Sequence, residues 1–231
     1  MVIKATLAAS AIAAAAMASS ASAETVLLNF VGGTATPWGQ VHIDVSPIVT
    51  NTNEYAVGLN MTSSSSLGNF VAWCLDLGHS ISQGGPYSYD TTTTPFTNTF
   101  DLFAAGAMAR VQSVFDASYA SVITSNTDQA AGFQLALWEV LYDSNWTLAT
   151  GAFQATANAG ILGYANTYLT AGLAGGNAGA YDLTYLQSNA TNPQLQNLVT
   201  ASPSAVPLPA GGLLLLAALG GLGLARRRKT V

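Results

Sequence analysis

The chain has 231 residues, of which half are hydrophobic and only 7% are charged. All eleven acidic residues lie between residues 24 and 205, where Arg110 is the only Lys or Arg, so this segment carries a formal charge of −10. Such a surface cannot neutralise phosphates, which excludes nucleic acid as a natural partner and disfavours anionic membrane surfaces. The segment is long enough for one domain with a substantial hydrophobic core.

The N-terminus has the three parts of a secretory signal peptide. Lys4 provides the positive charge, Leu7–Met17 is an Ala-rich apolar core, and Ala21-Ser22-Ala23 fits the small-x-small cleavage rule. We therefore expect residues 1–23 to be removed before Glu24 and the remainder to be exported.

The first third of the exported segment predicts β-strands. Thr25–Val31 is apolar and β-prone, and apolar alternation marks two further strands, at Gln40–Ser46 and Glu54–Thr62. Asn69–Leu77 is almost continuously apolar, as expected of a strand that is covered on both faces. Residues 78–97 contain Gly84-Gly85-Pro86 and a Thr run, which predict a loop with a short hairpin.

The hydrophobic period then becomes helical. Asn98 is the expected N-cap of a helix over 100–122, and Asn126, with Gln129 three residues later, predicts a capped helix over 127–143. A weaker helical stretch covers 155–172. Strand patterns return at Tyr181–Gln187 and Gln196–Thr200. Together these elements predict an α+β domain over residues 24–200, an antiparallel sheet or barrel with an inserted helical lobe.

Cys74 is the only cysteine, so it cannot form an internal disulfide and must be buried, paired with another molecule or chemically used. On the helix over 127–143, Gln134 shares an apolar stripe with Ala130, Trp138 and Leu141. A buried amide left unpaired costs about 1–3 kcal/mol. We therefore expect a hydrogen-bonding or covalent partner for Gln134. The more solvated stripe of this helix is expected to hold Asp128, Gly132, Glu139 and Asp143.

The pattern around these two residues is a cysteine near the end of an apolar strand, followed sixty residues later by a helical Gln-x-Ala-aliphatic-Trp. Here it comprises Cys74 with Leu75 and Asp76, and Gln134 with Ala136, Leu137 and Trp138. This pattern resembles the thioester domains of bacterial surface proteins, although Phe133 stands where that family has Thr. The resemblance implies that the cysteine sulfur and the glutamine carbonyl carbon are joined, with loss of ammonia.

A thioester is an activated acyl group that an amine or hydroxyl of another molecule can attack, which leaves a stable covalent link. Burial beside Trp73 and Trp138 would keep water from the bond. The domain also has no lysine that could consume the acyl group. This interpretation requires no metal or cofactor, and the protein would not be an enzyme.

Two other interpretations remain open. Cys74 could be a small buried hydrophobic residue with Gln134 bonded to backbone, in a non-reactive structural module of a biofilm matrix. A cysteine hydrolase built on Cys74 and His79 is a third, but the spacing shows no group that would orient the histidine. His42 and His79 are expected to be structural, and Asp76, Glu139 and Asp143 to be solvated or capping.

The C-terminus has three parts in a fixed order. A linker with a Pro motif covers 201–209, an apolar run covers 210–225, and a basic tail covers 226–231. The motif comprises Val206, Pro207, Leu208, Pro209 and Ala210, and the basic cluster comprises Arg226, Arg227, Arg228 and Lys229. Because basic flanks stay in the cytoplasm, the preceding domain would lie outside.

This tail resembles that of the PEP-CTERM proteins of Gram-negative bacteria, in the version with the VPLPA motif. The resemblance implies a transmembrane helix that holds the chain in the inner membrane in transit. It also implies recognition by an exosortase and delivery to the cell surface or extracellular matrix. The simpler alternative is a permanent tail anchor.

Overall fold

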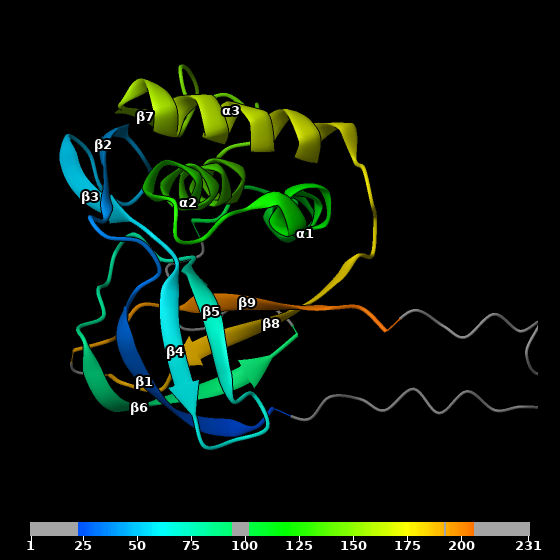
Figure 1. The fold of residues 1–231 in the computed structure, drawn as a ribbon. Helices are drawn as coiled ribbons and strands as arrows, with labels where there is room; N and C mark the ends of the chain where they lie inside the picture. Colours follow the sequence, from blue (N-terminus) through cyan, green and yellow to red (C-terminus); the bar gives the residue numbers. More distant parts are fainter. Residues whose placement is uncertain (1–22, 94–101, 192, 206–231) are drawn as a thin grey trace, which may run out of the picture.

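The structure is a computed structural model that describes residues 23–93, 102–191 and 193–205. Six antiparallel strands close into a barrel, and three helices form a layer over one end of it (Figure 1). Around the barrel the strands run β1 (Thr25–Gly33), β4 (Leu59–Ser63), β5 (Asn69–Cys74), β9 (Leu198–Pro203), β8 (Tyr181–Ser188) and β6 (Gly84–Thr92). The predicted α+β class, with a barrel and a helical lobe, is confirmed.

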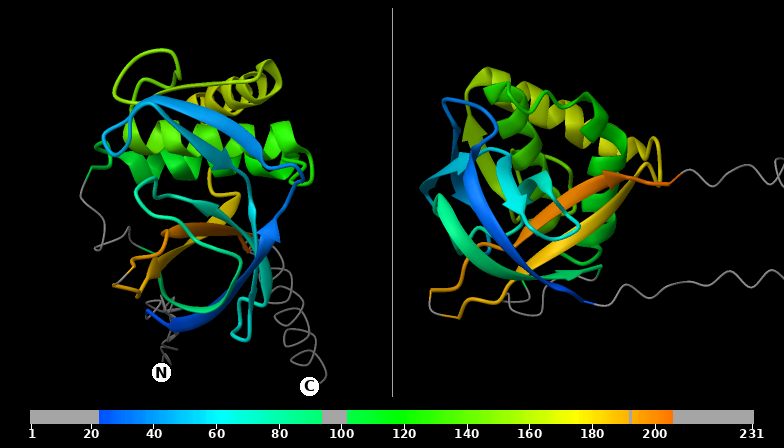
Figure 2. Two further views of the ribbon diagram at one scale, coloured as in Figure 1. Left: turned by 90° about the vertical axis from the view of Figure 1, so that its left-hand side faces the viewer. Right: turned by 60° about the horizontal axis from the view of Figure 1, so that its bottom comes forward.

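A second, three-stranded sheet lies beside the helices. Its order is β3 (Thr52–Ala56), β2 (Gly39–Val45) and β7 (Gln154–Ala157), and all of its pairs are antiparallel. The helices are α1 (Ala107–Ser118), α2 (Thr127–Tyr142) and α3 (Ala159–Ala174), with a 3-10 turn at Tyr119–Ser121. Figure 2 shows the same arrangement from two other sides, with α3 outermost and α2 nearer the barrel.

The barrel strands form because alternate side chains can enter one closed interior. In β1, Val26, Leu28 and Phe30 are buried while the residues between them are exposed. They meet Met61 and Leu186 from other strands in one apolar cluster. A separate, larger cluster fills the space between the barrel end, the small sheet and the helices.

Helix α2 is buried on all sides from Gln129 to Tyr142. Its predicted N-cap is confirmed, because the side chain of Asn126 accepts the N–H of Gln129 at 3.0 Å. The Gln129 side chain instead accepts the N–H of Ile123, so the box is not reciprocal. The predicted polar stripe is wrong at Gly132, Glu139 and Asp143, which are all buried. Helix α3 covers Gly132, and Glu139 accepts the N–H of Thr147 from the loop after α2.

Several predicted boundaries are also wrong. The single strand expected over Glu54–Thr62 is divided, since the chain leaves the small sheet after Ala56 and enters the barrel at Leu59. Residues 84–92 form a full barrel strand between β1 and β8 rather than a loop. The expected 69–77 strand ends at Cys74, and β9 continues into the expected linker to Pro203.

The helical boundaries differ as well. Helix α1 begins at Ala107, because Gly106 takes a left-handed conformation at its N-cap. The stretch predicted as one weak helix is strand β7 followed by helix α3. Asn158 lies between them and is the N-cap of α3. The predicted cap Asn98, signal peptide, sorting motif and 210–225 span fall on residues that the structure does not describe, apart from Ala23. Within the described ranges, none of the helices combines the length and the apolarity needed to cross a membrane.

Candidate thioester site

The end of strand β5 meets the middle of helix α2. On one side, β5 pairs with β9 as far as the register Cys74–Leu198. On the other side its ladder with β4 ends earlier, at the pair Ala72–Leu59. The backbone of Cys74 therefore extends beyond its neighbour on the β4 side, where its N–H and C=O need other partners.

Gln134 supplies both partners. Its Oε1 accepts the backbone N–H of Cys74 at 2.8 Å, and its Nε2 donates to the backbone C=O of Cys74 at 2.8 Å. The side chain is 1% exposed. The predicted pair is therefore in direct contact, and the partner that the buried amide required is the residue that also carries the thiol.

The thiol of Cys74 is held on its other side by the chain that follows. Its Sγ donates to the C=O of Asp76 at 2.9 Å and accepts the N–H of Asp76 at 3.2 Å. Burial raises the pKa of the Cys74 thiol well above its ordinary value, and the Asp76 carboxylate adds to the shift. The thiol is therefore protonated at neutral pH.

The indole of Trp138 lies on the same face of α2 as Gln134 and close to this thiol. The backbone N–H of Asp76 and the indole of Trp138 both lower the pKa of Cys74 and so offset part of the increase that burial causes. The Nε1–H of Trp138 does not form a hydrogen bond with Sγ, and it has no other acceptor among the described residues. A buried donor of this kind could bind an oxygen that acquires negative charge beside the sulfur.

A small cleft of about 150 Å³ reaches Cys74 from the surface. We call it the Cys74 cleft. Besides apolar groups, its lining includes Cys74, Glu54, His79, Gln196, Trp38 and Tyr55. Burial raises the pKa of Glu54, which shows that this carboxyl is partly withdrawn from water.

His79 has an orienting partner, contrary to the prediction. Its Nδ1 lies 2.7 Å from Oδ2 of Asp76, whose other carboxylate oxygen accepts the N–H of Gly78. With Nδ1 protonated towards Asp76, Nε2 is the nitrogen that can take a proton. Sequence spacing did not reveal this pair because the turn after Cys74 folds the two residues together. Asp76 is 5% exposed, so its expected solvation is wrong.

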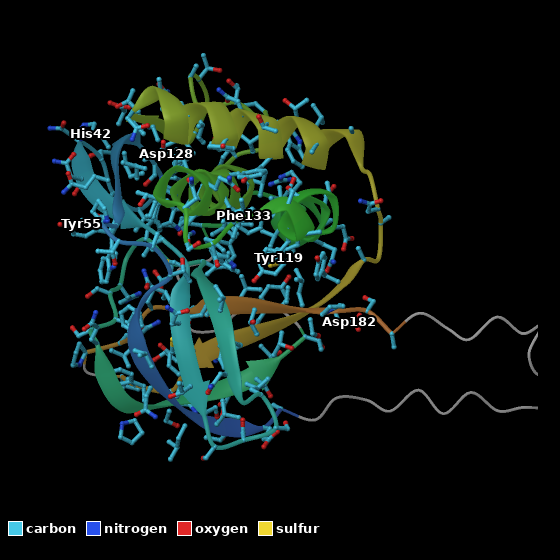
Figure 3. All side chains as sticks on the ribbon, in the orientation of Figure 1. His42, Tyr55, Tyr119, Asp128, Phe133 and Asp182 are labelled. Atoms are coloured by element: carbon cyan, nitrogen blue, oxygen red, sulfur yellow. The ribbon has the colours of Figure 1, made fainter. Side chains whose placement is uncertain are left out.

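Two other residues that were predicted to support the site, Trp73 and Ala136, contribute to packing. Trp73 is fully buried, with its ring centroid 4.8 Å from that of Phe133. Phe133 also contacts the rings of Phe115, Tyr119 and Tyr168, so it is the centre of an aromatic cluster in the layer between helices and barrel (Figure 3). Ala136 is buried in the same helix.

The carboxylates of α2 differ from the prediction. Glu139 is fully buried, and burial, followed by the nearby Asp143 carboxylate, raises its pKa to about 8. Asp143 is the C-cap residue of α2, and its carboxylate holds the loop that follows by accepting the N–H groups of Ser144, Asn145 and Phe153. Neither carboxylate lines the Cys74 cleft.

Three groups at the site gave no signal in the sequence. Glu54 and Gln196 line the cleft from β3 and from the segment before β9. Tyr142, two turns beyond Gln134, accepts the N–H of Leu77 at 3.3 Å and fixes the turn after Cys74. All three depend on tertiary contacts between distant segments, which local spacing cannot encode.

Comparison with known proteins adds little. No protein-family model matches the chain, and no curated protein sequence matches it. Among solved structures, it is similar to the N-terminal domain of the pilus tip adhesin Cpa of Streptococcus pyogenes, with 14% identity and a TM-score of 0.38. That match covers 75% of this chain and 100% of the other. A likeness this distant supplies no argument about function.

Proposed function

We propose that this chain is an exported cell-surface or matrix protein in which Cys74 and Gln134 form an internal thioester for covalent attachment to another molecule. The observation that carries the proposal is the pair of 2.8 Å hydrogen bonds that hold the Gln134 carboxamide on Cys74. They hold this carboxamide on the backbone of the residue that carries the thiol, in a buried site that a cleft connects to solvent.

Formation of the bond requires no cofactor. The Cys74 sulfur attacks Cδ of Gln134, a C–S bond forms, the C–N bond of the carboxamide breaks, and ammonia leaves with the thiol proton. The thiol must first release the C=O of Asp76, to which it donates. Negative charge develops on Oε1 during the attack, and the backbone N–H of Cys74, which already donates to that oxygen at 2.8 Å, stabilises it.

In the attachment step, the sulfur of Cys74 becomes the leaving group. An amine or hydroxyl that enters the Cys74 cleft attacks the same carbonyl carbon, the C–S bond breaks, and the proton of the nucleophile returns to sulfur. His79 carries this proton, since its Nδ1 is fixed on Asp76 and its Nε2 can accept. Each chain reacts once, so the process is an attachment without turnover.

The surroundings protect the acyl group. Cys74 and Gln134 are both buried, which limits attack by water. The only cation between residues 24 and 205 is Arg110, whose guanidinium donates to the backbone C=O of Val140 and of Ala105. No lysine amine of the domain can therefore compete with an external acceptor.

The termini carry the sorting part of the proposal. The signal peptide directs export, and the VPLPA motif with its apolar run and basic tail recruits an exosortase that removes the tail. We expect the surface form to lack residues 1–23 and the apolar tail. Terminal peptide mapping of surface-extracted protein tests this, and a surface form that retains Arg226–Val231 would indicate a permanent anchor.

One observation favours the alternative of a non-reactive surface or matrix module. The two hydrogen bonds of Gln134 are also those of a structural amide that completes the ladder where β4 ends. In that case the thiol remains bonded to Asp76 and nothing is lost from the chain.

Intact mass separates the two functions. The folded, exported protein should be one ammonia lighter than its sequence, and its Cys74 should resist thiol reagents until methylamine is added. Cys74→Ala should show the mass of its own sequence and incorporate no methylamine. Gln134→Ala should leave a free thiol. Asp128→Asn is a matched control, because Asp128 lies on the same helix outside the Cys74 cleft, and it should behave as the unmodified chain.

A further inference from the structure

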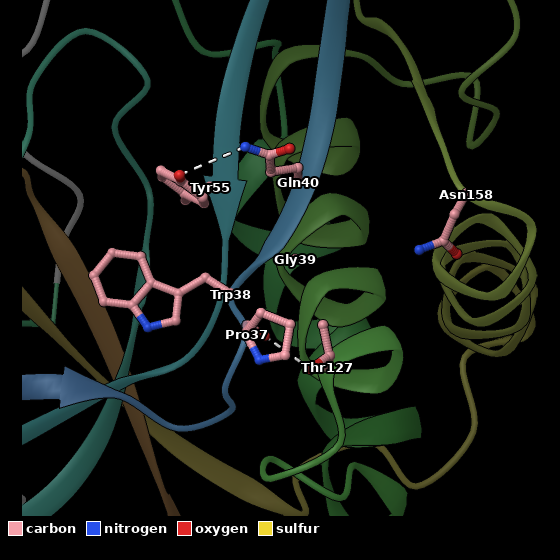
Figure 4. Close-up of a pocket in the computed structure, with 7 residues that line it drawn as sticks. All are labelled: Pro37, Trp38, Gly39, Gln40, Tyr55, Thr127 and Asn158. Atoms are coloured by element: carbon pink, nitrogen blue, oxygen red, sulfur yellow. Dashed lines mark hydrogen bonds between the residues drawn. The ribbon is translucent and has the colours of Figure 1, made fainter.

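A wide, open depression of about 720 Å³ lies beside the start of strand β2 (Figure 4). We call it the Trp38–Tyr55 depression. Its lining comprises Trp38, Tyr55, Gln40, Thr127, Asn158 and the backbone at Pro37 and Gly39. These residues come from β2, β3 and the N-terminal ends of α2 and α3, which are far apart in the sequence.

The chemistry of the lining is aromatic and neutral. The rings of Trp38 and Tyr55 meet edge to face with centroids 5.5 Å apart, and Tyr55 is 57% exposed. Gln40 and Asn158 add exposed amide groups, and no charged side chain lines the depression. The exposed ring of Tyr55 and the partly exposed ring of Trp38, with neutral hydrogen-bonding groups around them and no carboxylate to pair with a cation, suit an uncharged, hydroxyl-rich ligand.

Hydrogen bonds and one close backbone contact hold the residues of the depression in place. Thr127 donates to the C=O of Pro37 at 2.8 Å, which ties the start of α2 to the strand. Asn158 accepts the N–H of Ile161 and donates to Asp128, so its side chain has a fixed direction. A Cβ added at Gly39 would lie 2.3 Å from Cβ of Ala131, so only glycine lets the strand approach the helix this closely.

The depression adjoins the Cys74 cleft. Trp38 and Tyr55 line both, so the two hollows share these rings as a wall. Cys74 lines the smaller hollow, on the other part of its lining.

We propose that the Trp38–Tyr55 depression binds a neutral carbohydrate and that this carbohydrate supplies the hydroxyl acceptor for the Cys74–Gln134 acyl group. The C–H face of a sugar ring would lie on an aromatic ring, and its hydroxyls would bond to the amides of Gln40 and Asn158. The acceptor role rests on the proposed thioester, whereas the binding role does not. In the transfer, the sugar oxygen bonds to Cδ of Gln134, the C–S bond breaks, and the hydroxyl proton ends on Sγ.

Binding is tested without the thioester. The full chain carrying Cys74→Ala is titrated with tetrasaccharides of glucose, galactose and N-acetylglucosamine, and Trp fluorescence and calorimetry follow the titration. At least one should bind saturably. Tyr55→Ala should weaken it about tenfold and Tyr55→Phe by less, since Phe keeps the ring face. Tyr164→Ala, a half-exposed tyrosine of α3 outside the lining, should leave binding unchanged.

Binding of none of these sugars, or binding that Tyr55→Ala does not alter, would overturn the site. Capture of neutral peptides in their place would do the same. With Cys74 restored, the bound tetrasaccharide should add its mass through a base-labile ester, and Tyr55→Ala should slow this step but not the reaction with methylamine. Reaction with methylamine alone overturns the acceptor role and leaves the thioester intact. Sugar binding with no covalent product of either kind contradicts the thioester and supports the binding site.

Discussion

The barrel interior and the layer between barrel and helices satisfy their polar groups in different ways. The barrel cluster consists of apolar side chains and Tyr89, whose hydroxyl donates to the C=O of Gln196. The polar groups that the barrel buries lie mainly along β8 and β9, where Oδ1 of Asn197 accepts the N–H of Ser188. The helices, by contrast, bury Gln134, Glu139 and Asp116, each hydrogen-bonded to backbone groups of another segment. Where strand ladders stop against a helix, side chains must complete the hydrogen bonding, and the candidate chemistry lies at that junction.

The largest effect should come from removing the centre of the aromatic layer. Phe133→Ala deletes a fully buried ring with four ring neighbours and should lower the free energy of unfolding by about 3–5 kcal/mol. Leu27→Ala, on the exposed face of β1, should change it by less than about 0.5 kcal/mol. Urea denaturation of both measures the difference. Equal effects would mean that the layer is not packed as described.

The second effect depends on pH. Unfolded Glu139 ionises near its ordinary pKa, whereas the native carboxyl keeps its proton until about pH 8. The native state therefore binds more protons between these values, and stability should fall as pH rises, by up to about 1.4 kcal/mol per unit, before levelling off above pH 8.

Glu139→Gln removes this titration. Its stability, measured by urea denaturation from pH 5 to pH 8.5, should be flatter with pH than that of the unmodified chain. The largest gain should appear at the alkaline end. A parallel pH dependence in both proteins would show that Glu139 is ionised in the fold.

The third effect comes from removing the hydrogen bonds between Gln134 and the backbone of Cys74. Gln134→Met keeps the approximate shape of the side chain but leaves the N–H and C=O of Cys74 without their partner, which should cost about 1–3 kcal/mol. Loss of a thioester closure would add to this cost, by analogy with a disulfide. Tyr89→Phe removes one buried hydroxyl hydrogen bond of the barrel cluster and should cost only about 1 kcal/mol. Equal losses in chemical denaturation would remove the distinction between the two regions.

The smallest effect concerns the N-cap of α2. Asn126→Ala leaves the N–H of Gln129 without its side-chain acceptor and should cost about 1 kcal/mol. Asn126→Asp retains an acceptor and should cost less. Thermal denaturation in the same buffer compares the two variants, and identical melting temperatures would count against the cap.

The sequence predicted that strands and helices exist better than it predicted which of their faces are buried. In β1 the buried Val26, Leu28 and Phe30 alternate with exposed residues, but two of the exposed ones, Leu27 and Val31, are apolar, so the period is not visible in the sequence. Helix α2 has no exposed face over most of its length, so periodicity assigned Glu139 to solvent when it is buried. Pattern alone cannot distinguish a polar side chain that faces water from one that is paired inside.

The same limit applies at the site. Local pattern predicted Cys74 and Gln134, because a lone cysteine and a glutamine on an apolar stripe are both unusual. Alternation along the predicted strand Glu54–Thr62 would put Tyr55 on the same face as Val57 and Leu59, which are buried, but the change of sheet after Ala56 leaves Tyr55 exposed. The Asp76–His79 pair and the two hollows arise from tertiary folding, which spacing along the chain does not report.

Peptide mapping of the exported protein tests the central claim most directly. Trypsin has a single site between residues 24 and 205, at Arg110, so digestion is best done with pepsin at acidic pH, followed by tandem mass spectrometry. The account predicts one linked pair of peptides, one containing Cys74 and the other Gln134, that is lighter by one ammonia than the two together. Two separate linear peptides, with a free Cys74 thiol and an intact Gln134 carboxamide, would contradict it.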